Sequence, residues 1–499
     1  MPATSAAYRV YERHVRTPCS LAPLGARQVT ITPLTRLSQA PRRPRLALVA
    51  ACVLVACSLA GPPVALAGSG SDERIVVRFK HDVGAGARAA VRSAAGVSVA
   101  RRDGGATELV KAQEGVPVAS AMRRLRAARP VAWVERSLVA GAAYVPNDSG
   151  VASAAGPAGG WTSVQWELNG PFGIAAPQAW SQATRLGGSG GRGIKIAILD
   201  IGVAYSGRGS YRRSPDLSAS RFARGYDFIG EDPYPNDEFG HGTFVASIIG
   251  ATANNNFGTV GIAYRSKIMP VRVLDYEGKS DAFTIARGVR YAVDHDADVI
   301  NLSLELFDSP PLPPTPRSVM TSRTVRSALR YARSEGVIVV SAAGNSFDLR
   351  VPGGHNDTLA INVGGTTEHG CLGNYSNHGP GLDVVAPGGG QDAPLTSDPN
   401  CSPQATAGRD ISGVSFDADT PSRFEMLPGF RGTSSAAPHV TGVVALVLAS
   451  RVLGRHPTSR EVEEHIENTA RDLGESGRDR YYGAGLVDAT AATRSSSSG

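Results

Sequence analysis

The stretch that decides the fold is Ile194-Lys195-Ile196-Ala197-Ile198-Leu199, which carries a single polar residue. A strand buried on both faces of a sheet requires a near-continuous apolar run of this kind. Similar runs follow along the chain, at residues 268–274, 299–303 and 337–340. Segments of helical periodicity lie between them, at residues 283–295 and 324–334. Strands that alternate with helices in this way predict an α/β domain with a mainly parallel sheet and helices on both faces.

Two polar residues follow these strands, at the sheet edge where functional groups of open parallel sheets lie. Asp200 comes directly after the first run, and Asn345 ends the segment Ser341-Ala342-Ala343-Gly344-Asn345 beyond the fourth. Taken alone, an aspartate after a strand is more often an Asx-turn or a helix cap than a catalytic residue. Asp200 therefore needs partners elsewhere in the chain before it can be given a catalytic role.

Two further segments each place a reactive residue at the start of a predicted helix. His241 opens the helix-forming segment 241–249, where a single histidine is more often structural than catalytic. Ser434 follows a glycine turn in the segment 432–448, whose helix is apolar nearly all round and must therefore be buried. The free N–H groups and positive dipole at the start of that helix suit a developing oxyanion. An ordinary N-cap serine is the alternative.

Taken together and in this order, the four segments resemble the subtilisin-like (subtilase) family of serine peptidases, whose chain order is Asp, His, Ser. The resemblance covers residues 165–493 and implies a secreted endopeptidase that hydrolyses peptide bonds through an acyl-enzyme. It implies that Ser434 is the nucleophile, that His241 is its base, and that Asp200 orients the base. Asn345 would join the backbone N–H of Ser434 in the oxyanion hole. A catalytically silent binding or scaffold protein is the main alternative, and the presence of all four residues argues against it.

The resemblance also implies substrate contacts, and here the chain departs from the family's usual residues. The substrate-binding positions that it implies are Ser303, Leu304, Glu305, Ala342, Ala343 and Gly344. Glu305 stands where related enzymes usually carry glycine, on the strand that pairs with the substrate backbone. We expect its carboxylate, with the proline-rich loop 308–316, to reshape the non-primed subsites and to disfavour acidic side chains nearby. Ile201 after the aspartate and Ser435 after the nucleophile are further departures, and neither changes the triad itself.

Calcium is the cofactor that the resemblance implies. The family's strong site combines a Gln near the mature N-terminus, an Asp beyond the first catalytic strand, and an Asn with carbonyl groups in the loop after the histidine helix. The residues in fitting places are Gln165, Asp216 and Asn255, with the carbonyl groups of Phe257 and Thr259. Oxygen-only ligation of this kind suits Ca²⁺. Asn-rich turns are also common without a metal, and this loop is one residue longer than usual.

The N-terminal region has the features of an export signal. A basic stretch at residues 42–45 precedes an apolar run at residues 46–60, and residues 64–67 offer small side chains at the signal-peptidase positions. The apolar run is shorter than the roughly 20 residues of a membrane-spanning helix. We therefore expect a secreted, extracellular protein that is cleaved after residue 67 and has no membrane association. A lipid anchor at Cys57 is the alternative, and a translation start closer to residue 42 would shorten the long stretch before it.

Cysteine usage agrees with export. Of the five cysteines, only Cys371 and Cys401 lie beyond the signal region. Two cysteines in an oxidising compartment favour one disulfide, worth about 3 to 4 kcal/mol in the chain-entropy model. Two unpaired buried thiols are the alternative.

Residues 74–139 predict a second, smaller unit. Their pattern indicates the order β-α-β-β-α-β, an α+β unit of ferredoxin-like type. This unit resembles the inhibitory propeptide that precedes many subtilases. We expect it to help folding, to block the cleft, and to be removed by autocatalytic cleavage between Val139 and Gln165.

These patterns divide the chain into five regions. They are an export signal region 1–67, a propeptide 68–140, an exposed linker rich in Ala, Gly and Ser 141–164, a peptidase domain 165–493 and a short tail 494–499.

The charge distribution argues against nucleic acid as a partner. Up to residue 140 there are 21 Lys and Arg against 8 Asp and Glu, whereas beyond it there are 30 against 36. The net charge of +7 therefore comes from the leader and the predicted propeptide, where no basic stripe with interleaved aromatic residues occurs. The expected partners are protein or peptide substrates and the chain's own propeptide, and we expect a monomer.

Overall fold

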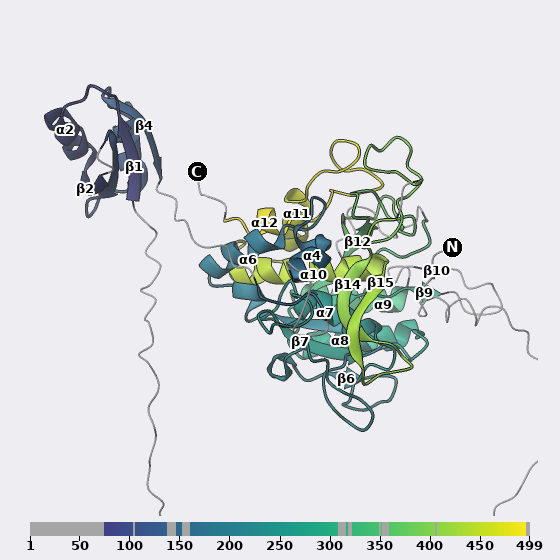
Figure 1. The fold of residues 1–499 in the computed structure, drawn as a ribbon. Helices are drawn as coiled ribbons and strands as arrows, with labels where there is room; N and C mark the ends of the chain where they lie inside the picture. Colours follow the sequence, from purple (N-terminus) through teal and green to yellow (C-terminus); the bar gives the residue numbers. More distant parts are fainter. Residues whose placement is uncertain are drawn as a thin grey trace, which may run out of the picture. The chain divides into compact units, whose positions relative to one another are not determined.

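The structure is a computed structural model and describes residues 74–102, 105–136, 146–151, 160–307, 316–317, 322–348, 351, 359–404 and 407–495. The chain divides into two compact units, whose described residues lie within 74–136 and 146–495 (Figure 1). The predicted signal region with Cys57, most of the proline-rich loop and the end of the predicted tail lie outside the described residues.

The smaller unit is a four-stranded antiparallel sheet with two helices. Its elements are β1 (Arg74–Phe79), α2 (Ala85–Ala95), β2 (Val97–Arg102), β3 (Thr107–Ala112), α3 (Val118–Ala127) and β4 (Val131–Arg136). The strand order is β2-β3-β1-β4. Alternate residues of β1, namely Ile75, Val77 and Phe79, are buried together with Leu125 of α3. This is a ferredoxin-like arrangement.

The larger unit is built on a parallel sheet of seven strands in the order β13-β12-β11-β8-β5-β7-β6. Every pairing in this sheet is parallel. The strands are β5 (Lys195–Asp200), β6 (Tyr226–Asp227), β7 (Lys267–Arg272), β8 (Val299–Leu302), β11 (Ile338–Ala342), β12 (Ile361–Thr366) and β13 (Val384–Pro387). The predicted parallel sheet is therefore confirmed.

Helices cover both faces of this sheet, and β5 shows how. Its residues Ile196 and Ile198 belong to one apolar cluster, whereas Ala197 and Leu199 belong to another. The first cluster includes residues of α6 (Ala176–Arg185), α7 (His241–Gly250), α10 (Thr433–Ser450) and α11 (Ser459–Asn468). The second includes residues of α8 (Ala282–Asp294) and α9 (Arg323–Ser334). Because successive side chains of a strand point to opposite faces, the apolar run must be covered twice.

Helix α10 is the central helix of the first cluster. Within the described part of the chain it is the one helix that is long and apolar enough to cross a membrane, with a mean hydropathy of 1.3 over 18 residues. In this fold 83% of that stretch is buried inside the protein. Its apolar character therefore serves the core.

Short elements complete the larger unit. They are α4 (Trp161–Val164), α5 (Trp166–Asn169), α12 (Ala489–Ala492), the 3-10 turns η1 (Ser189–Gly191) and η2 (Ala219–Arg221), the pair β9 (Leu306–Phe307) and β10 (Pro316–Arg317), and the hairpin β14 (Ile411–Phe416) and β15 (Phe424–Phe430). The hairpin packs on α7, where the rings of Phe430 and Phe244 stack with their centroids 3.7 Å apart.

The exposed linker predicted for residues 141–164 is wrong for its described parts. Trp161 is 1% exposed, and its indole N–H donates to the carbonyl of Pro146. Asp148 is also buried, and Gly150 and Val151 pair through their backbone with Gly258. Composition was misleading because a few anchoring side chains and backbone pairs hold this small-residue segment against the peptidase unit.

Candidate active site

Asp200 and His241 meet at the carboxyl edge of the sheet. Asp200 is the last residue of β5 and is fully buried, and His241 is the first residue of α7. The Nδ1 atom of His241 lies 2.8 Å from Oδ1 and 3.0 Å from Oδ2 of Asp200. Asp200 Oδ1 also accepts the N–H of Ile201 at 2.8 Å. Because Nδ1 faces the carboxylate, Nε2 is the ring nitrogen left for proton transfer.

A glycine allows this approach of helix to strand. A Cβ atom at Gly242 would lie 2.0 Å from the carbonyl oxygen of Gly202 and 3.0 Å from the Cβ of Asp200. Neither neighbour could move without displacing the end of β5. The Gly that follows His241 is therefore a packing requirement of the Asp200–His241 pair.

Asp237, which the sequence analysis did not identify, fixes the start of α7. Its Oδ1 accepts the N–H groups of Phe239 and Gly240, and its Oδ2 accepts both the N–H and the hydroxyl of Thr243, at 2.6 to 2.9 Å. Asp237 is 1% exposed. A helix cap of this kind orients the first turn, and with it His241.

The charges around His241 favour its protonated form. Burial disfavours the imidazolium, but the charge and hydrogen bond of Asp200, with the charge of Asp237, outweigh it and raise the pKa of His241. Such a pair suits a base that must hold a proton during a reaction.

Ser434 lies in the first turn of α10, beside the ends of β8 and β11. Its carbonyl accepts the hydroxyl of Ser303 at 3.0 Å, and the same hydroxyl accepts from the amide of Asn301 at 2.9 Å. Thr441, on the third turn of α10, donates to the other end of the Asn301 amide at 2.8 Å. This chain of bonds ties the start of α10 to β8 and so positions Ser434.

Asn345 lies next to the same helix start. Its Oδ1 accepts the N–H of Thr433 at 2.8 Å and the Thr433 hydroxyl at 3.1 Å. The amide Nδ2 is therefore the end of the side chain that remains for a ligand. Gly432, with φ of 140°, brings the chain close: a Cβ there would lie 3.1 Å from Asn345 Oδ1.

Two side chains hold the segment that carries Asn345. Glu305 Oε1 accepts the N–H of Asn345 at 2.7 Å. Asn377 accepts the N–H groups of Ser346 and Asp348, each at 3.0 Å, and donates to the carbonyl of Ala343. Asn377 was missed by the sequence analysis because it lies 29 to 34 residues from its partners there. Burial raises the pKa of Glu305, and the Asn345 N–H opposes this.

The structure brings all six predicted substrate-binding residues to the ends of two neighbouring strands. Ser303, Leu304 and Glu305 follow β8, and Ala342, Ala343 and Gly344 end or follow β11, the neighbouring strand. The hydrogen bonds from Ser303 to the Ser434 carbonyl and from the Asn345 N–H to Glu305 place these residues beside Ser434 and Asn345. Among the described residues, no hydrogen bond joins the Ser434 hydroxyl to His241, although α7 and α10 pack together.

The predicted calcium ligands form a second polar group. Asp216, fully buried, accepts the amide of Asn255 at 2.7 Å and the N–H of Thr259 at 2.9 Å. Asp148, which the sequence analysis placed in a linker, accepts the N–H groups of Asn254 and Asn255. Burial, with the charge of Asp148, raises the pKa of Asp216 to about 7. Two buried carboxylates are oxygen donors that fit Ca²⁺, and the Asn255 amide turns its nitrogen to Asp216 while its oxygen accepts from Phe257.

Among the described residues, no hydrogen bond joins Gln165 to Asp148, Asp216 or Asn255. The Gln165 amide makes two hydrogen bonds with the backbone of Val260, one accepted at 2.8 Å and one donated at 3.2 Å. Phe257 donates its N–H to Asn255.

The predicted disulfide between Cys371 and Cys401 is formed, which excludes the alternative of two free thiols.

Comparison with known proteins points to one family. The family described as the Subtilase family matches residues 191–485. Subtilisin BL of Lederbergia lenta is 32% identical over 328 residues, which cover 65% of this chain and 98% of that protein. Thermitase of Thermoactinomyces vulgaris is 33% identical over 322 residues, 64% of this chain and 93% of thermitase.

Two further matches extend the comparison. A thermophilic serine proteinase of Bacillus sp. strain AK1 is 30% identical over 417 residues, 83% of this chain and 85% of that protein. A protease structure from Pseudoalteromonas arctica PAMC 21717 superimposes with a TM-score of 0.53 and 29% identity, covering 70% of this chain and 99% of that chain.

Proposed function

This chain belongs to the subtilase family and is a serine-type endopeptidase, and we propose that Asp200, His241 and Ser434 are its catalytic triad. The observation that carries the assignment is the contact of His241 Nδ1 with the buried carboxylate of Asp200 at 2.8 Å. It holds the imidazole in the tautomer whose Nε2 can take a proton from a hydroxyl. Ser434, at the start of a helix packed on α7, supplies that hydroxyl.

In the proposed mechanism, Ser434 Oγ attacks the scissile carbonyl while His241 Nε2 takes its proton. Asp200 stabilises the imidazolium that forms. His241 then gives the proton to the leaving amine, and an acyl-enzyme on Ser434 remains. A water molecule repeats the sequence, with His241 again as base, and releases the acid.

The negative oxygen of the tetrahedral intermediate is stabilised by Asn345 Nδ2 and the backbone N–H of Ser434. The bonds from Thr433 to Asn345 Oδ1 support this, because they leave Nδ2 as the donor. Loss of one such donor costs about 10²- to 10³-fold in kcat, a magnitude measured in a subtilisin.

Two adjacent serines give a matched test of the nucleophile. Ser434→Ala is expected to abolish labelling by a fluorophosphonate probe and peptide hydrolysis, whereas Ser435→Ala is expected to keep both. Ser435 is buried in the same helix turn, so the pair controls for local packing. Labelling that survives in Ser434→Ala would reject the assignment.

For Glu305 we propose a role in specificity that adds to its hydrogen bond with Asn345. Glu305→Gln keeps an acceptor for the Asn345 N–H and removes the charge, whereas Glu305→Gly removes both. Cleavage of a peptide library measures the preference. Both variants are expected to accept peptides with acidic side chains more readily than the wild type does. An unchanged preference in both would remove the specificity role, and a kcat loss in Glu305→Gly alone would assign the residue to positioning.

We also propose that residues 74–136 belong to an inhibitory propeptide that is cleaved in cis. The 417-residue match to the proteinase of strain AK1 supports this, because a match of that length must extend beyond the peptidase domain into the smaller unit. Asn147 to Val151 bond to the loop 254–258 of the peptidase unit. A cut that preserves these bonds falls before Asn147.

N-terminal sequencing of the mature enzyme tests the proposed cleavage position. Wild type is expected to begin between residues 140 and 146. The Ser434→Ala chain, purified without added protease, is expected to stay uncut. Maturation of that variant at the wild-type position would show that another protease performs the cleavage.

Secretion as a soluble enzyme is proposed from the basic and apolar pattern of residues 42–67. Recovery of the mature enzyme from the culture medium is expected. Palmitate incorporation together with retention in the membrane fraction would favour the lipid-anchored alternative at Cys57.

A structural calcium ion is proposed at Asp216 and Asn255, with Asp148 as a further ligand and the carbonyl groups of Phe257 and Thr259. When bound, it would neutralise the two buried carboxylates and fasten residues 147–151 to the peptidase unit. Asp216→Asn is expected to bind one calcium ion fewer per chain than the surface control Asp419→Asn, measured by equilibrium dialysis. Equal numbers would remove the site.

A further inference from the structure

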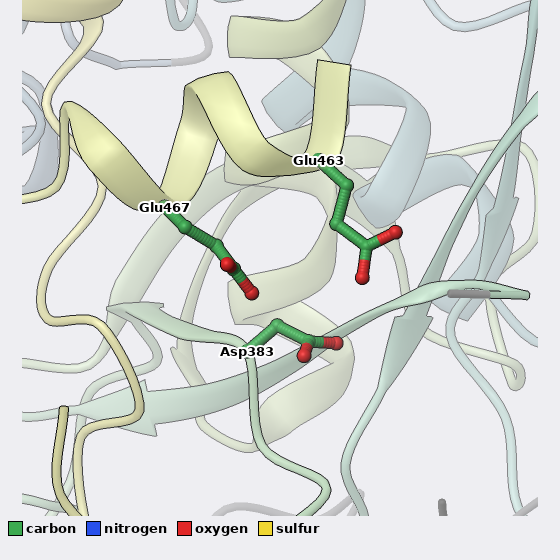
Figure 2. A group of neighbouring side chains, drawn as sticks. All are labelled: Asp383, Glu463 and Glu467. Carbon is green, nitrogen blue, oxygen red and sulfur yellow. The ribbon is translucent and has the colours of Figure 1, made fainter. Parts of the chain in front are cut away.

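A group of three acidic side chains lies outside the active site, where α11 approaches the edge of the sheet (Figure 2). Asp383 stands directly before β13, and Glu463 and Glu467 lie one turn apart on α11. Residues four apart share a helix face, so both glutamates turn toward Asp383. One carboxylate oxygen from each residue lies within 4.8 Å of the other two. We call these three residues the acidic cluster.

The acidic cluster is buried, and the positive charges that oppose its own are those of Arg333 and Arg478. Asp383 is 3% and Glu463 is 4% exposed. Arg478 forms an ion pair with Glu467, and its other nitrogen donates to the carbonyl of Leu382 at 2.7 Å. Within the described part of the chain, the carboxylate of Asp383 accepts hydrogen bonds only from the neutral groups of Asn362, at 2.7 and 3.3 Å.

Among the residues that the structure describes, Glu463 has no hydrogen-bond or ion-pair partner. No described residue donates a hydrogen bond to its carboxylate, which points into the cluster in Figure 2. Burial, followed by the charges of Asp383 and Glu467, raises the pKa of Glu463 to about 8, and burial raises that of Asp383 to about 7. Buried carboxylates in native proteins are normally paired or coordinate a metal.

Asn362 provides an independent observation. It is 2% exposed, and its Oδ1 has no hydrogen-bond partner in the described part of the chain. The amide lies at the cluster, because its Nδ2 is 3.3 Å from Asp383 Oδ2. A half-turn of the amide would present this unpartnered oxygen to a ligand between the carboxylates.

We propose that Asp383, Glu463 and Glu467 bind a calcium ion that joins α11 to the edge of the sheet. Ca²⁺ lies 2.3 to 2.6 Å from its ligands, so oxygen atoms on opposite sides of it are about 5 Å apart, and three oxygen atoms within 4.8 Å of one another can all reach it. Mg²⁺ loses its water reluctantly and is rarely held by a set of protein ligands alone, so a group of buried carboxylates favours Ca²⁺. Asn362 Oδ1 would be a fourth protein ligand, and Glu467, with 13% of its side chain exposed, marks the side open to water.

The test compares two neighbouring glutamates of α11. Glu463→Gln keeps the shape of the side chain and removes its charge. Glu464→Gln is the matched control, because the side chain of Glu464 is 49% exposed and pairs with Arg460. Both are made in the full-length chain with Ser434→Ala, which prevents self-digestion. After treatment with a chelator, calcium binding is measured by equilibrium dialysis with calcium chloride.

The Glu463→Gln chain is expected to bind one calcium ion fewer than the Glu464→Gln chain, and its Tm to rise less when calcium is added. Counting ions separates this site from the one proposed at Asp216. Asp383→Asn should give the same loss and replaces Glu463→Gln if that variant does not fold. Equal numbers of bound ions in the variant and the control would overturn the proposal, and would mean that a shared proton balances the acidic cluster.

Discussion

His241 and His439 both belong to apolar helices, yet their pKa values move in opposite directions. His241 begins α7 with 22% of its side chain exposed and lies against Asp200. His439 lies inside α10 and is fully buried, with Nδ1 2.8 Å from the carbonyl oxygen of Ser435. Its Nε2 has no partner among the described residues.

Burial disfavours the charged form of both rings, so the difference comes from their neighbours. At His241 the carboxylates of Asp200 and Asp237 outweigh burial and raise the pKa. At His439 burial prevails, although the Ser435 carbonyl opposes it, and the pKa falls to about 4. A nearby carboxylate, more than the apolar helix, decides which histidine can serve as a base.

The largest expected effect follows from removing the carboxylate beside His241. Asp200→Asn should lower kcat by about 10⁴-fold, because the amide favours the wrong tautomer of the imidazole. Steady-state hydrolysis of a peptide substrate measures it. His439→Asn is the control and should change kcat by less than about ten-fold, since in the described part of the chain no hydrogen bond joins His439 to the triad. Comparable losses in the two variants would abolish the distinction between the histidines.

The second effect concerns stability in acid. The folded pKa of His439, about 4, lies below the usual value of 6.5, so the unfolded chain takes up the proton first as the pH falls. The stability that neutral His439 contributes to the folded protein is intact above pH 6.5. It is lost as the pH falls from 6.5 to 4, by about 3 kcal/mol in total. Both chains compared carry Ser434→Ala. As the pH is lowered from 6.5 to 4, the free energy of unfolding should therefore fall less steeply in the chain with His439→Asn than in the chain that keeps His439. Parallel curves from urea unfolding would contradict this.

A smaller effect is expected at the second carboxylate near His241. Asp237→Asn removes an acceptor from the start of α7 and should cost about 1 to 3 kcal/mol of stability. It also removes one of the charges that raise the pKa of His241. The acidic limb of kcat/KM should then move to lower pH, by less than about one unit, because the base stays unprotonated further into acid. A shift to higher pH would show that Asp237 acts on His241 in another way.

Much of this architecture could be predicted from local patterns. The four apolar runs predicted the central strands of the sheet, and the small-residue run after Ser434 predicted a buried helix. The two late cysteines predicted their disulfide by elimination and compartment. Such patterns suffice because burial on two faces or all round leaves a repeated mark on neighbouring residues.

Other features could not be predicted because they depend on contacts between distant segments. Asp237 resembles any loop aspartate until its carboxylate is seen at the start of α7. Asp148 lies in a segment of small residues, and 106 positions separate it from Asn254, whose N–H it accepts. The acidic cluster joins residue 383 to residues 463 and 467.

By itself, the sequence determined the parallel sheet, the order of its helices and the candidate residues of the active site, because periodicity and motif spacing are properties of the chain. Only the tertiary structure decided which of those residues have partners. Asp200 lies 41 residues from His241, and Glu305 lies 40 residues from Asn345. The pKa of a side chain follows from the charges and the burial around it, and folding brings these together from separate parts of the sequence.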